Sequence, residues 1–401
     1  MKLCLVSQEY PPETAKGGIG TQTFLQARGL AALGHQVTVL SHSIDERRHE
    51  SIEHGVHVIR IPGFDSRLAI ATEPVRWLTY SAEVAAAISA LNVEKRFDLV
   101  VFPEWGGEGY VHLLNQTEWN RLPTWVHMHG SISMFAHYAN WPETNSEFFR
   151  IASEMESVCL RLADAVSSSS RFSADWCAKQ YQLKRGPIPV FHTGVDTEIF
   201  SPKPVAKETV PTIIFAGSVT AQKGVPLLVG AACRLAREFP GLQLKILGRG
   251  DGKMIQELQQ KALSSGFPEL LVFEGFVPRE NLAEHFSRAH VFAGPSVFEG
   301  GPGFVYLEAM ACGLPVIACD GSGVTEIVAH GQNGLLVPPQ NEESLTGTLR
   351  EILANPEKAA AMGAHARRYV LDHASSETCL KQIEAHYLSF ISNHVSNRVC
   401  S

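Results

Sequence analysis

Short apolar runs alternate along the chain with amphipathic stretches, and one order of predicted elements occurs twice. Each occurrence consists of a strand, a glycine-rich loop, a helix and a second strand. These segments are 2–7, 16–21, 22–33 and 36–40 in the first half, and 213–216, 217–224, a helix ending at 237, and 243–247 in the second. Two such openings, in halves of similar length, predict an α/β protein with two doubly wound domains whose ligand lies between the carboxyl ends of both sheets.

Further apolar runs continue this pattern in both halves. The predicted strands are 56–61, 99–102, 124–127 and 165–168, then 271–274, 291–294, 316–319 and 334–337. Helical periodicity lies between them, for example over 81–91 and 282–287. The stretch 193–204 is rich in turn residues and contains alternating prolines, so it predicts a hinge between the two domains.

The composition is that of a globular protein large enough for two domains. Its 401 residues are 45% hydrophobic and 19% charged, and a single core rarely grows so large. The formal net charge of −7 gives no basic field for nucleic acid, so we expect no nucleic-acid partner. Eight cysteines lack any Cys-x-x-Cys or Cys/His ligand spacing, which indicates reduced thiols in the core.

The N-terminal apolar run, residues 1–7, lacks the long hydrophobic region and cleavage site of a signal peptide. No apolar stretch approaches the length of a membrane span. We therefore expect a cytoplasmic protein, and the sequence leaves open a peripheral contact with the inner face of the membrane.

The segment 298–318 places a glycine-rich turn between a predicted strand and a helix of small residues. It reads Phe-Glu-Gly-Gly-Pro-Gly-Phe-Val-Tyr-Leu-Glu-Ala-Met-Ala-Cys-Gly-Leu-Pro-Val-Ile-Ala. Free backbone N–H groups and the positive end of the helix point at whatever occupies such a turn, which makes it an anion site. Glu299 and Glu308 flank it, and a phosphate with sugar hydroxyls uses both features. The simpler interpretation is two solvated glutamates and an ordinary loop.

This segment resembles the signature of retaining GT-B glycosyltransferases of family 4, also called glycosyl transferases group 1. The family motif is Glu, seven residues, Glu, then Ala-Met-Ala-x-Gly-x-Pro-Val, whereas eight residues separate Glu299 from Glu308 here. The Ala-Met-Ala that follows Glu308 anchors this residue in the motif, so the additional residue falls in the turn. The resemblance is tight over 290–340 and loose over the rest of the chain.

The resemblance implies a GT-B fold, with two facing Rossmann-like domains, a cleft between them and a C-terminal crossover helix. The implied parts are an N-terminal acceptor domain 1–193 braced by a C-terminal helix 376–395, a hinge linker 194–210, and a C-terminal nucleotide-sugar donor domain 211–375.

Lys223 lies just before a predicted helix, where its charge and the free N–H groups of the helix can act together on a diphosphate. The simpler interpretation is a solvated lysine at a helix start. The loop resembles the family pattern Gly-Arg-x-x-x-x-Lys-Gly, with Gly217 at its start and Ser218 in place of the arginine. Arg249 is the candidate to take over the role of that missing cation.

The other donor contacts follow from the resemblance. Glu308 is expected to bind the ribose hydroxyls and Glu299 the hydroxyls of the donor sugar. The remaining donor-binding positions lie in three loops: Gly17, Gly18 and Gly20 over the phosphates and sugar, Phe276 and Val277 at the base, and Gly303, Phe304 and Val305 at the phosphates.

The acceptor side has fewer signals. His129 ends a predicted strand and matches the family's histidine near the transferred sugar; His127 points the same way, but no third metal ligand lies nearby. Glu104 and Trp105 follow another strand and are candidates for the acceptor cleft, with a capping tryptophan as the alternative. The aromatic segment 134–149 reads as a loop that either holds a sugar or lipid acceptor or packs against the protein.

The resemblance implies a retaining transferase that moves a hexose-type sugar from a nucleotide diphosphate sugar to a hydroxyl of a glycan, glycolipid or small molecule. Lys223, Glu299 and His129 are its implied catalytic residues. Because the chain has no Asp-x-Asp motif, we expect no metal ion and no cofactor. The alternatives are a sugar-nucleotide epimerase, a non-catalytic sugar-nucleotide-binding relative and a NAD enzyme. The last is disfavoured because the first glycine-rich loop lacks the Gly-x-Gly-x-x-Gly spacing and the second strand ends without an acidic residue.

Overall fold

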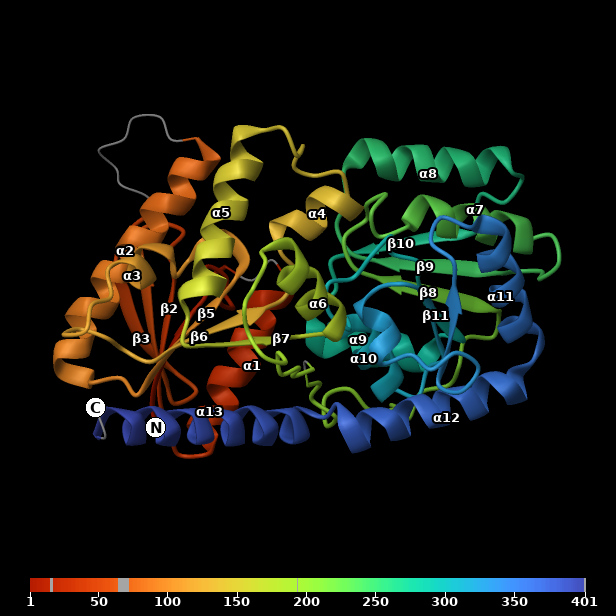
Figure 1. Ribbon diagram of the computed structural model, residues 1–401. Helices are drawn as coiled ribbons and strands as arrows, with labels where there is room; N and C mark the ends of the chain where they lie inside the picture. The colour runs from red at the N-terminus through yellow and green to blue at the C-terminus, as the bar shows by residue number, and fades with distance from the viewer. Residues whose placement is uncertain (15–16, 64–71, 193, 400–401) are drawn as a thin grey trace. The chain divides into compact units, whose positions relative to one another are not determined.

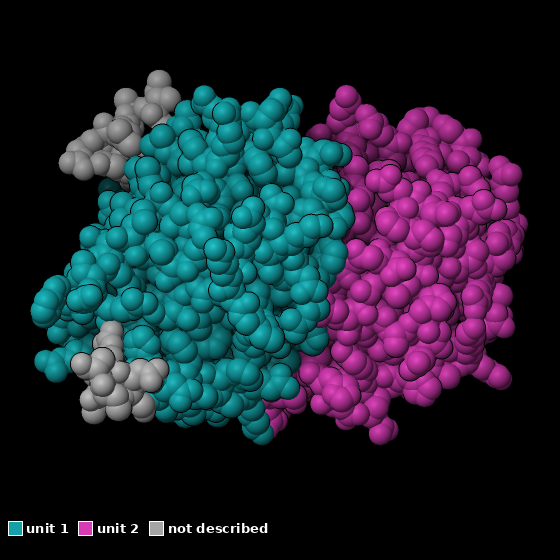
Figure 2. All heavy atoms as spheres, viewed as in Figure 1, with its two compact units in different colours: residues 1–192, 379–401 teal, residues 193–378 magenta. Residues whose placement is uncertain are grey.

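The computed structural model describes residues 1–14, 17–63, 72–192 and 194–399 (Figure 1). Its internal contacts divide the chain into two compact units: unit 1 comprises residues 1–192 and 379–401, and unit 2 comprises residues 193–378 (Figure 2). Residue 16 of the predicted glycine-rich loop and residue 193 of the predicted linker lie outside the described residues.

The described part of unit 1 forms a seven-stranded sheet in the order β3-β4-β2-β1-β5-β6-β7. The strands are β1 (Lys2–Val6), β2 (Gln36–His42), β3 (His49–Glu53), β4 (Val56–Ile61), β5 (Leu99–Pro103), β6 (Thr124–Met128) and β7 (Ala165–Ser168). The helices are α1 (Gly18–Ala32), α2 (Glu73–Lys95), α3 (Tyr110–Leu114), α4 (Ile132–Tyr138), α5 (Glu147–Leu162), α6 (Arg171–Gln180) and, from the end of the chain, α13 (Ser376–Val399), with a 3-10 turn η1 (Trp105–Gly107). Neighbouring strands pair in parallel except β3, which is antiparallel to β4.

Each face of this sheet has its own core, because alternate residues of a strand point to opposite faces. Cys4 and Val6 of β1 join side chains of α2, α5 and α6. Leu3 and Leu5 join side chains of α1 and α13. A mainly parallel sheet covered by helices on both faces is the α/β layering that the apolar runs predict.

The described part of unit 2 forms a six-stranded parallel sheet in the order β10-β9-β8-β11-β12-β13. The strands are β8 (Thr212–Ala216), β9 (Gln243–Leu247), β10 (Leu271–Gly275), β11 (Val291–Gly294), β12 (Val316–Cys319) and β13 (Gly334–Val337). The helices are α7 (Val225–Leu235), α8 (Gly252–Ser264), α9 (Arg279–Arg288), α10 (Phe304–Ala311), α11 (Glu342–Ala354) and α12 (Pro356–His373), with a 3-10 turn η2 (Gly323–Glu326). Its strand order, 3-2-1-4-5-6 in chain order, is that of a Rossmann fold.

The same alternation builds two cores in unit 2. Ile213 and Phe215 of β8 pack with α7, α8 and α11, while Ile214 and Ala216 pack with α9, α10 and α12. The helix α10 therefore lies on the sheet face opposite to α7, and both begin near the carboxyl end of a strand.

The chain passes between the units at residues 192–193 and 378–379. Beside these crossings, the Val195 N–H donates to the carbonyl oxygen of Ala374 (2.9 Å), and the Ser376 N–H donates to that of Val195 (2.8 Å). A Cβ at Gly194 would lie 2.6 Å from the Cα of Ser376, so this close approach requires glycine.

Two predicted loops are helical in the structure. The helix α1 begins at Gly18 rather than at residue 22, so the loop prediction was wrong there; glycines have low helix propensity and hide this first turn in the sequence. The aromatic segment 134–149 contains most of α4 and the start of α5. No helix among the described residues is both long enough and apolar enough to cross a membrane.

Candidate active site

Lys223 lies in the loop after β8, two residues before α7 begins. Its Nζ is 2.7 Å from Oε1 of Glu299, and the two side chains are 38% and 15% exposed. Gly224 has a φ of 72°, and a Cβ there would lie 2.0 Å from the carbonyl oxygen of Pro295. Only glycine fits this position, and the loop can therefore hold Lys223 against the turn that carries Glu299.

The turn that carries Glu299 follows β11 and is tied down on both sides. The Val297 N–H donates to the carbonyl oxygen of Gln222 (2.8 Å), which joins the turn to the loop after β8. The Gly323 N–H donates to the carbonyl oxygen of Glu299 (2.8 Å), which joins it to the segment after β12.

The first turn of α10 is open to an anion. Its N-cap, Gly303, has a φ of 73° and provides no side-chain cap, so the N–H groups of Phe304 and Val305 have no partner within the helix. The buried Tyr306 donates its hydroxyl to the carbonyl oxygen of Gly294, which fixes the helix at the end of β11. The positive end of α10 thus faces the turn.

Glu308, further along α10, pairs with a residue that the sequence analysis did not single out. Nε of Arg279 is 2.7 Å from Oε1 of Glu308, and the glutamate side chain is 5% exposed. Burial raises the pKa of Glu308, and the nearby Arg279 opposes that rise. One feature of the sequence could have indicated Arg279 as a site residue: it is an arginine in the first turn of a helix, where the helix dipole disfavours a cation.

The loops after β9 and β10 lie beside the loop after β8. The Val219 N–H donates to the carbonyl oxygen of Arg249 (2.8 Å), and a Cβ at Gly248 would lie 1.8 Å from the carbonyl oxygen of Gly217. The guanidinium carbon of Arg249 is 4.9 Å from the centre of the Phe276 ring, and Phe276 is 62% exposed. The structure therefore places Arg249 against the predicted base loop.

The donor candidates of unit 2 gather at one edge of its sheet. Four neighbouring parallel strands, β10, β9, β8 and β11, end there, and ligands of Rossmann folds bind at such carboxyl ends. The loops after these strands carry Phe276 with Val277, Arg249, the exposed Ser218 with Lys223, and Glu299.

The three glycine candidates of unit 1 belong to the start of α1. Gly17 is its N-cap, and Gly18 and Gly20 lie in its first turn. A Cβ at Gly20 would lie 2.7 Å from the Cβ of Glu9 and 2.9 Å from its carbonyl oxygen. Close packing on the segment after β1 thus explains why position 20 is a glycine. The backbone N–H groups of the first turn of α1 lie where a glycine-rich loop was expected.

His127 and His129 lie at the end of β6, with ring centres 4.8 Å apart. Nε2 of His127 is 3.0 Å from Nε2 of Gln22, and its Nδ1 is 2.8 Å from Oγ of Ser167. Because an amide nitrogen donates, Nε2 of His127 accepts and Nδ1 carries the proton. Burial lowers the pKa of His127 to about 4; burial and the nearby His127 lower the pKa of His129. Both imidazoles are therefore neutral near pH 7.

The arrangement around His127 leaves little room for a metal ion. Both of its ring nitrogens are engaged in hydrogen bonds. Within the described ranges, no group of three His, Cys, Asp or Glu side chains is suited to hold a metal ion.

Glu104 is fully buried just after β5. Its Oε1 accepts hydrogen bonds from the backbone N–H groups of His129 (2.7 Å) and Gly130 (2.6 Å). Burial raises the pKa of this carboxyl to about 7. Glu104 thus fixes the segment after β6 that carries His129, and its side chain has no exposed surface in this structure.

Trp105 lies within an aromatic cluster. Its ring centre is 5.7 Å from that of Trp77, 5.1 Å from Phe135 and 6.4 Å from Trp141. Phe148 packs on Trp77 at 5.1 Å. Phe135 and Trp141 of segment 134–149 therefore pack on Trp105, and Trp141 remains 47% exposed. Tyr138 of the same segment packs elsewhere, on Phe172 and Trp176.

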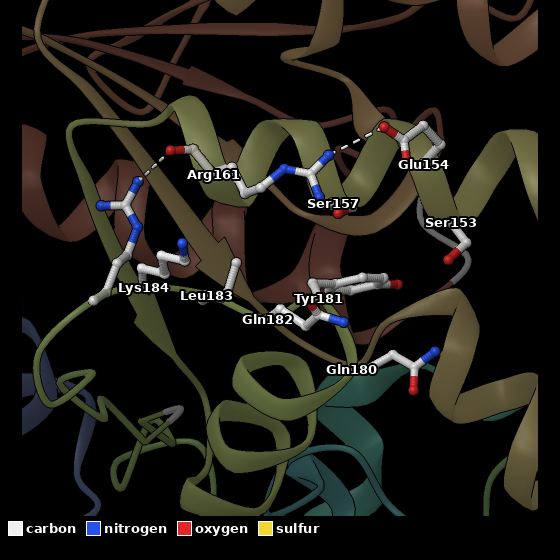
Figure 3. A pocket seen from close by; sticks show the side chains of 10 residues that line it. Ser153, Glu154, Ser157, Arg161, Gln180, Tyr181, Gln182, Leu183 and Lys184 are labelled. Atoms are coloured by element: carbon white, nitrogen blue, oxygen red, sulfur yellow. Dashed lines mark hydrogen bonds and ion pairs between the residues drawn. The ribbon is translucent and has the colours of Figure 1, made fainter.

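Unit 1 also has a polar hollow of about 800 Å³ beside α5 (Figure 3). Arg161 and Glu154 form an ion pair (3.0 Å) on its rim, and Arg185 donates to the carbonyl oxygen of Arg161 (3.0 Å). None of the predicted site residues lines this hollow. The lining residues are Ser153, Glu154, Ser157, Arg161 and 180–185.

The fold and the site together define the class of protein. The chain forms two Rossmann-like units, and the second carries a lysine, two carboxylates and an open helix start at the edge of its sheet. This combination is that of a GT-B glycosyltransferase. Sequence models of two families match the chain: "Glycosyl transferase 4-like domain" over residues 17–194 and "Glycosyl transferases group 1" over residues 196–369. The chain belongs to the group 1 glycosyltransferases of GT-B fold, which use nucleotide-sugar donors. The predicted family, fold class and enzyme class are thereby confirmed.

Similar proteins cover nearly the whole chain. The GDP-mannose-dependent alpha-(1-6)-phosphatidylinositol monomannoside mannosyltransferase of Mycolicibacterium smegmatis is 28% identical over 92% of this chain and 94% of its own length. Sucrose-phosphate synthase from Thermosynechococcus elongatus has a similar structure, with a TM-score of 0.83 and 23% identity over 98% of this chain and 99% of that one. Anabaena HepE in complex with UDP-glucose has a TM-score of 0.75 and 19% identity, over 97% of this chain and all of the other. At these identities the two structures support the fold alone.

Proposed function

We propose that this glycosyltransferase moves a hexose-type sugar from a nucleotide diphosphate sugar to an acceptor hydroxyl, retains the anomeric configuration and needs no metal ion. The observation that carries the proposal is the contact between Lys223 and Glu299 (2.7 Å) at the turn that leads into the open first turn of α10. A cation, a carboxylate and free N–H groups at one turn suit a diphosphate joined to a sugar.

The diphosphate would replace the present partner of Lys223. In this structure the ammonium neutralises Glu299, and the lysine side chain remains 38% exposed. A bound diphosphate brings more negative charge than one carboxylate, so Nζ is expected to turn to it while the N–H groups of Phe304 and Val305 bind the phosphate oxygens. Stabilising the charge that develops on the leaving diphosphate is the usual main contribution to catalysis.

Glu299, released from Lys223, would accept hydrogen bonds from hydroxyls of the donor sugar. The resemblance assigns His129 to the transferred sugar, and its lowered pKa makes it a neutral hydrogen-bonding group rather than a cation. Glu308 would accept from the ribose, and the exposed Phe276 marks the base loop.

The reaction proposed needs no protein base. The acceptor oxygen attacks the anomeric carbon from the side of the leaving group, a new C–O bond forms, and the bond from that carbon to the phosphate oxygen breaks. The departing phosphate oxygen takes the proton of the acceptor hydroxyl. The chain has no Asp-x-Asp motif, and Lys223 with the first turn of α10 would perform the charge neutralisation that a divalent ion performs elsewhere.

GDP and UDP are the first donor nucleotides to test, since one similar protein is named as GDP-mannose-dependent and the structure of another is a complex with UDP-glucose. A glycolipid is the first acceptor class to test, because the mycobacterial relative is named for a phosphatidylinositol monomannoside. A reaction in the cytoplasm, at the inner face of the membrane, would fit such an acceptor.

A thermal-shift screen with UDP, GDP, ADP and NAD, in the presence of EDTA, tests the site. A ligand that binds only the folded state raises the melting temperature, and we expect a selective rise with one nucleoside diphosphate that EDTA does not remove. No rise with any nucleotide, or a rise with NAD alone, would overturn the proposed site. Turnover of the matching nucleotide sugar, followed by NMR of the anomeric carbon of the product, then tests retention.

A non-catalytic relative is the second candidate. It is favoured by Ser218, which stands where the resemblance expects an arginine, and by the eight-residue spacing of the motif glutamates. Nucleotide binding without any transfer or hydrolysis of the donor would support it.

A further inference from the structure

Two nitrogens of the Arg279 guanidinium lie close to the same oxygen of the Glu308 carboxylate. Its Nε donates to Oε1 at 2.7 Å, and its Nη2 lies 2.7 Å from the same oxygen. A fork-to-fork pair would have engaged both carboxylate oxygens. Among the residues that the structure describes, the contacts of this carboxylate are made through Oε1, and no hydrogen bond to Oε2 is present.

The guanidinium is held in place by more than this carboxylate. Its central carbon lies 5.3 Å from the ring centre of Phe200 and 5.4 Å from that of Phe304, which are distances of cation–π contacts. Phe200 is fully buried, and Phe304 is the first residue of α10. Arg279 thereby connects α9, the linker and the helix that presents its N–H groups to the anion site.

The position of Arg279 in α9 is not explained by the stability of that helix. It is the first helical residue, where the dipole disfavours a positive charge. The last turn of the same helix has the usual arrangement, since Arg288 lies there and pairs with Glu284 at 2.8 Å. An arginine kept at the unfavourable end, with its charge directed at a buried carboxylate, indicates a role in the site.

We propose that Arg279 is a positioning residue for the donor's ribose: by holding Oε1 of Glu308 it directs Oε2 to the ribose hydroxyls and makes the site selective for ribonucleotides over 2′-deoxyribonucleotides. This inference rests on the ribose role of Glu308 in the proposed function. Arg279 acts through Glu308 and touches no reacting atom. Burial raises the pKa of Glu308 and Arg279 opposes that rise, so the arginine favours the ionised form of this carboxyl.

The test compares dissociation constants of GDP with 2′-deoxy-GDP, and of UDP with 2′-deoxy-UDP, by calorimetry. The proteins are the parent, Glu308→Gln, Arg279→Met, the double variant and Arg288→Met, which removes an exposed arginine of the same helix. For the nucleotide that binds, we expect the parent to prefer the ribonucleotide by roughly ten- to a hundredfold, the scale of a hydrogen bond to a charged group. In Arg279→Met and Glu308→Gln this preference should fall to about threefold or less, with little change for the deoxynucleotide.

The double variant should lose no more preference than either single variant, because the two residues act as one unit, and Arg288→Met should keep the parent's preference. Arg279→Lys, which keeps the charge but not the planar fork, should recover part of it. If Arg279→Met does not fold, Arg279→Gln, which removes the charge but keeps a polar side chain, is expected to show the same loss.

The outcomes separate the inference from the proposed function. If Glu308→Gln keeps the parent's preference, or the parent shows none, the ribose role of Glu308 fails and the inference fails with it. If Glu308→Gln loses the preference while Arg279→Met keeps it, the proposed site stands and the inference is overturned. An equal loss of affinity for ribo- and deoxynucleotides in Arg279→Met would also overturn it, because Arg279 would then bind the ligand directly.

Discussion

Each glutamate of the 298–318 motif faces a cation in unit 2, but the two pairs differ in exposure. Lys223 and Glu299 are 38% and 15% exposed, whereas Arg279 and Glu308 are 31% and 5% exposed. A diphosphate can separate the more exposed pair more easily. Separating a buried pair costs several kcal/mol of stability, because a buried charge is left without its partner. The first pair therefore suits exchange with ligand, and the second suits a fixed support.

Lys223→Ala should lower turnover by about a hundredfold or more, the scale of one charge contact made to a transition state. The fold should persist, because the ammonium is partly exposed. Lys253→Ala is the matched control, since that lysine lies near the start of another helix, in the first turn of α8, but is 83% exposed. Donor turnover at saturating substrate measures both, and equal activity of the two variants would remove Lys223 from the catalytic residues.

Buried carboxyls give unit 1 a distinct pH dependence. Burial raises the pKa of Glu104 to about 7 and that of Glu108 to about 8, so from about pH 4.5 to these values the two carboxyls bind more protons in the folded state than in the unfolded state. Burial lowers the pKa of His112 and His127 to about 4. These histidines bind fewer protons in the folded state than in the unfolded state, but only up to about pH 6.5, where histidines of the unfolded chain lose their protons. Between pH 6.5 and 8 the carboxyls dominate, and the free energy of unfolding should fall as pH rises.

Glu108→Gln should make this decrease in the free energy of unfolding less steep, because it removes one of the carboxyls that cause it. Each such group contributes at most about 1.4 kcal/mol per pH unit to the slope. The measurement is urea unfolding followed by tryptophan fluorescence, because all six tryptophans of the chain lie in unit 1. Glu94→Gln, at an exposed glutamate of α2, is the control. A parent profile that is flat from pH 6.5 to 8 would contradict the prediction.

At the scale of elements, strands were predicted better than helix boundaries. Buried parallel strands are short continuous apolar runs, and β4, β7, β9, β11, β12 and β13 have the predicted bounds. The strand β3 was missed because His49–Glu53 is a polar edge strand that is antiparallel to its one neighbour. The start of α1 and the whole of α4 were missed because glycine and aromatic side chains lower helix propensity, which tertiary packing then overrides.

The candidate site was predictable where one segment contains it. The turn with Glu299 and the helix with Glu308 are continuous in sequence, and the lysine loop has a recognisable pattern. Arg279 was not predicted, because its contact with Glu308 joins two helices 29 positions apart. The burial of Glu104 was not predicted either, since it depends on backbone donors from the neighbouring strand.

The packing of α12 on α10 gives a test at this scale. A Cβ at Gly363 of α12 would lie 2.0 Å from the carbonyl oxygen of Gly313, which lies two residues after the end of α10. Alanine normally stabilises a helix relative to glycine by about 0.5–1 kcal/mol, yet Gly363→Ala should destabilise unit 2 because backbone must move. Gly347→Ala in α11 has open space at its Cβ and should show the normal stabilisation. Thermal unfolding followed by circular dichroism checks both, and the same sign for the two variants would contradict the packing argument.

At the scale of the whole molecule, unit 1 is built from both ends of the chain. Residues 379–401 belong to it although unit 2 separates them from residues 1–192. Within unit 1, Glu384 lies 2.6 Å from Nε2 of His35, and a Cβ at Gly29 would lie 2.5 Å from Leu380, so α13 packs directly on α1. The end of the sequence therefore completes the core of the first unit.

Tyr387 tests this dependence because it is 3% exposed in the core between α13 and the sheet. Its ring centre lies 5.0 Å from that of Trp125, and its hydroxyl accepts a hydrogen bond from Gln26 at 2.9 Å. Tyr387→Ala should destabilise unit 1 by about 3–5 kcal/mol, the usual effect of deleting a large buried aromatic side chain. Leu388→Ala, at the next position but 45% exposed, should change the stability of unit 1 by less than about 1 kcal/mol.

Urea unfolding followed by tryptophan fluorescence reports unit 1, and nucleotide-induced stabilisation reports unit 2. If Tyr387→Ala left the tryptophan transition unchanged, α13 would not be part of the first unit's cooperative core.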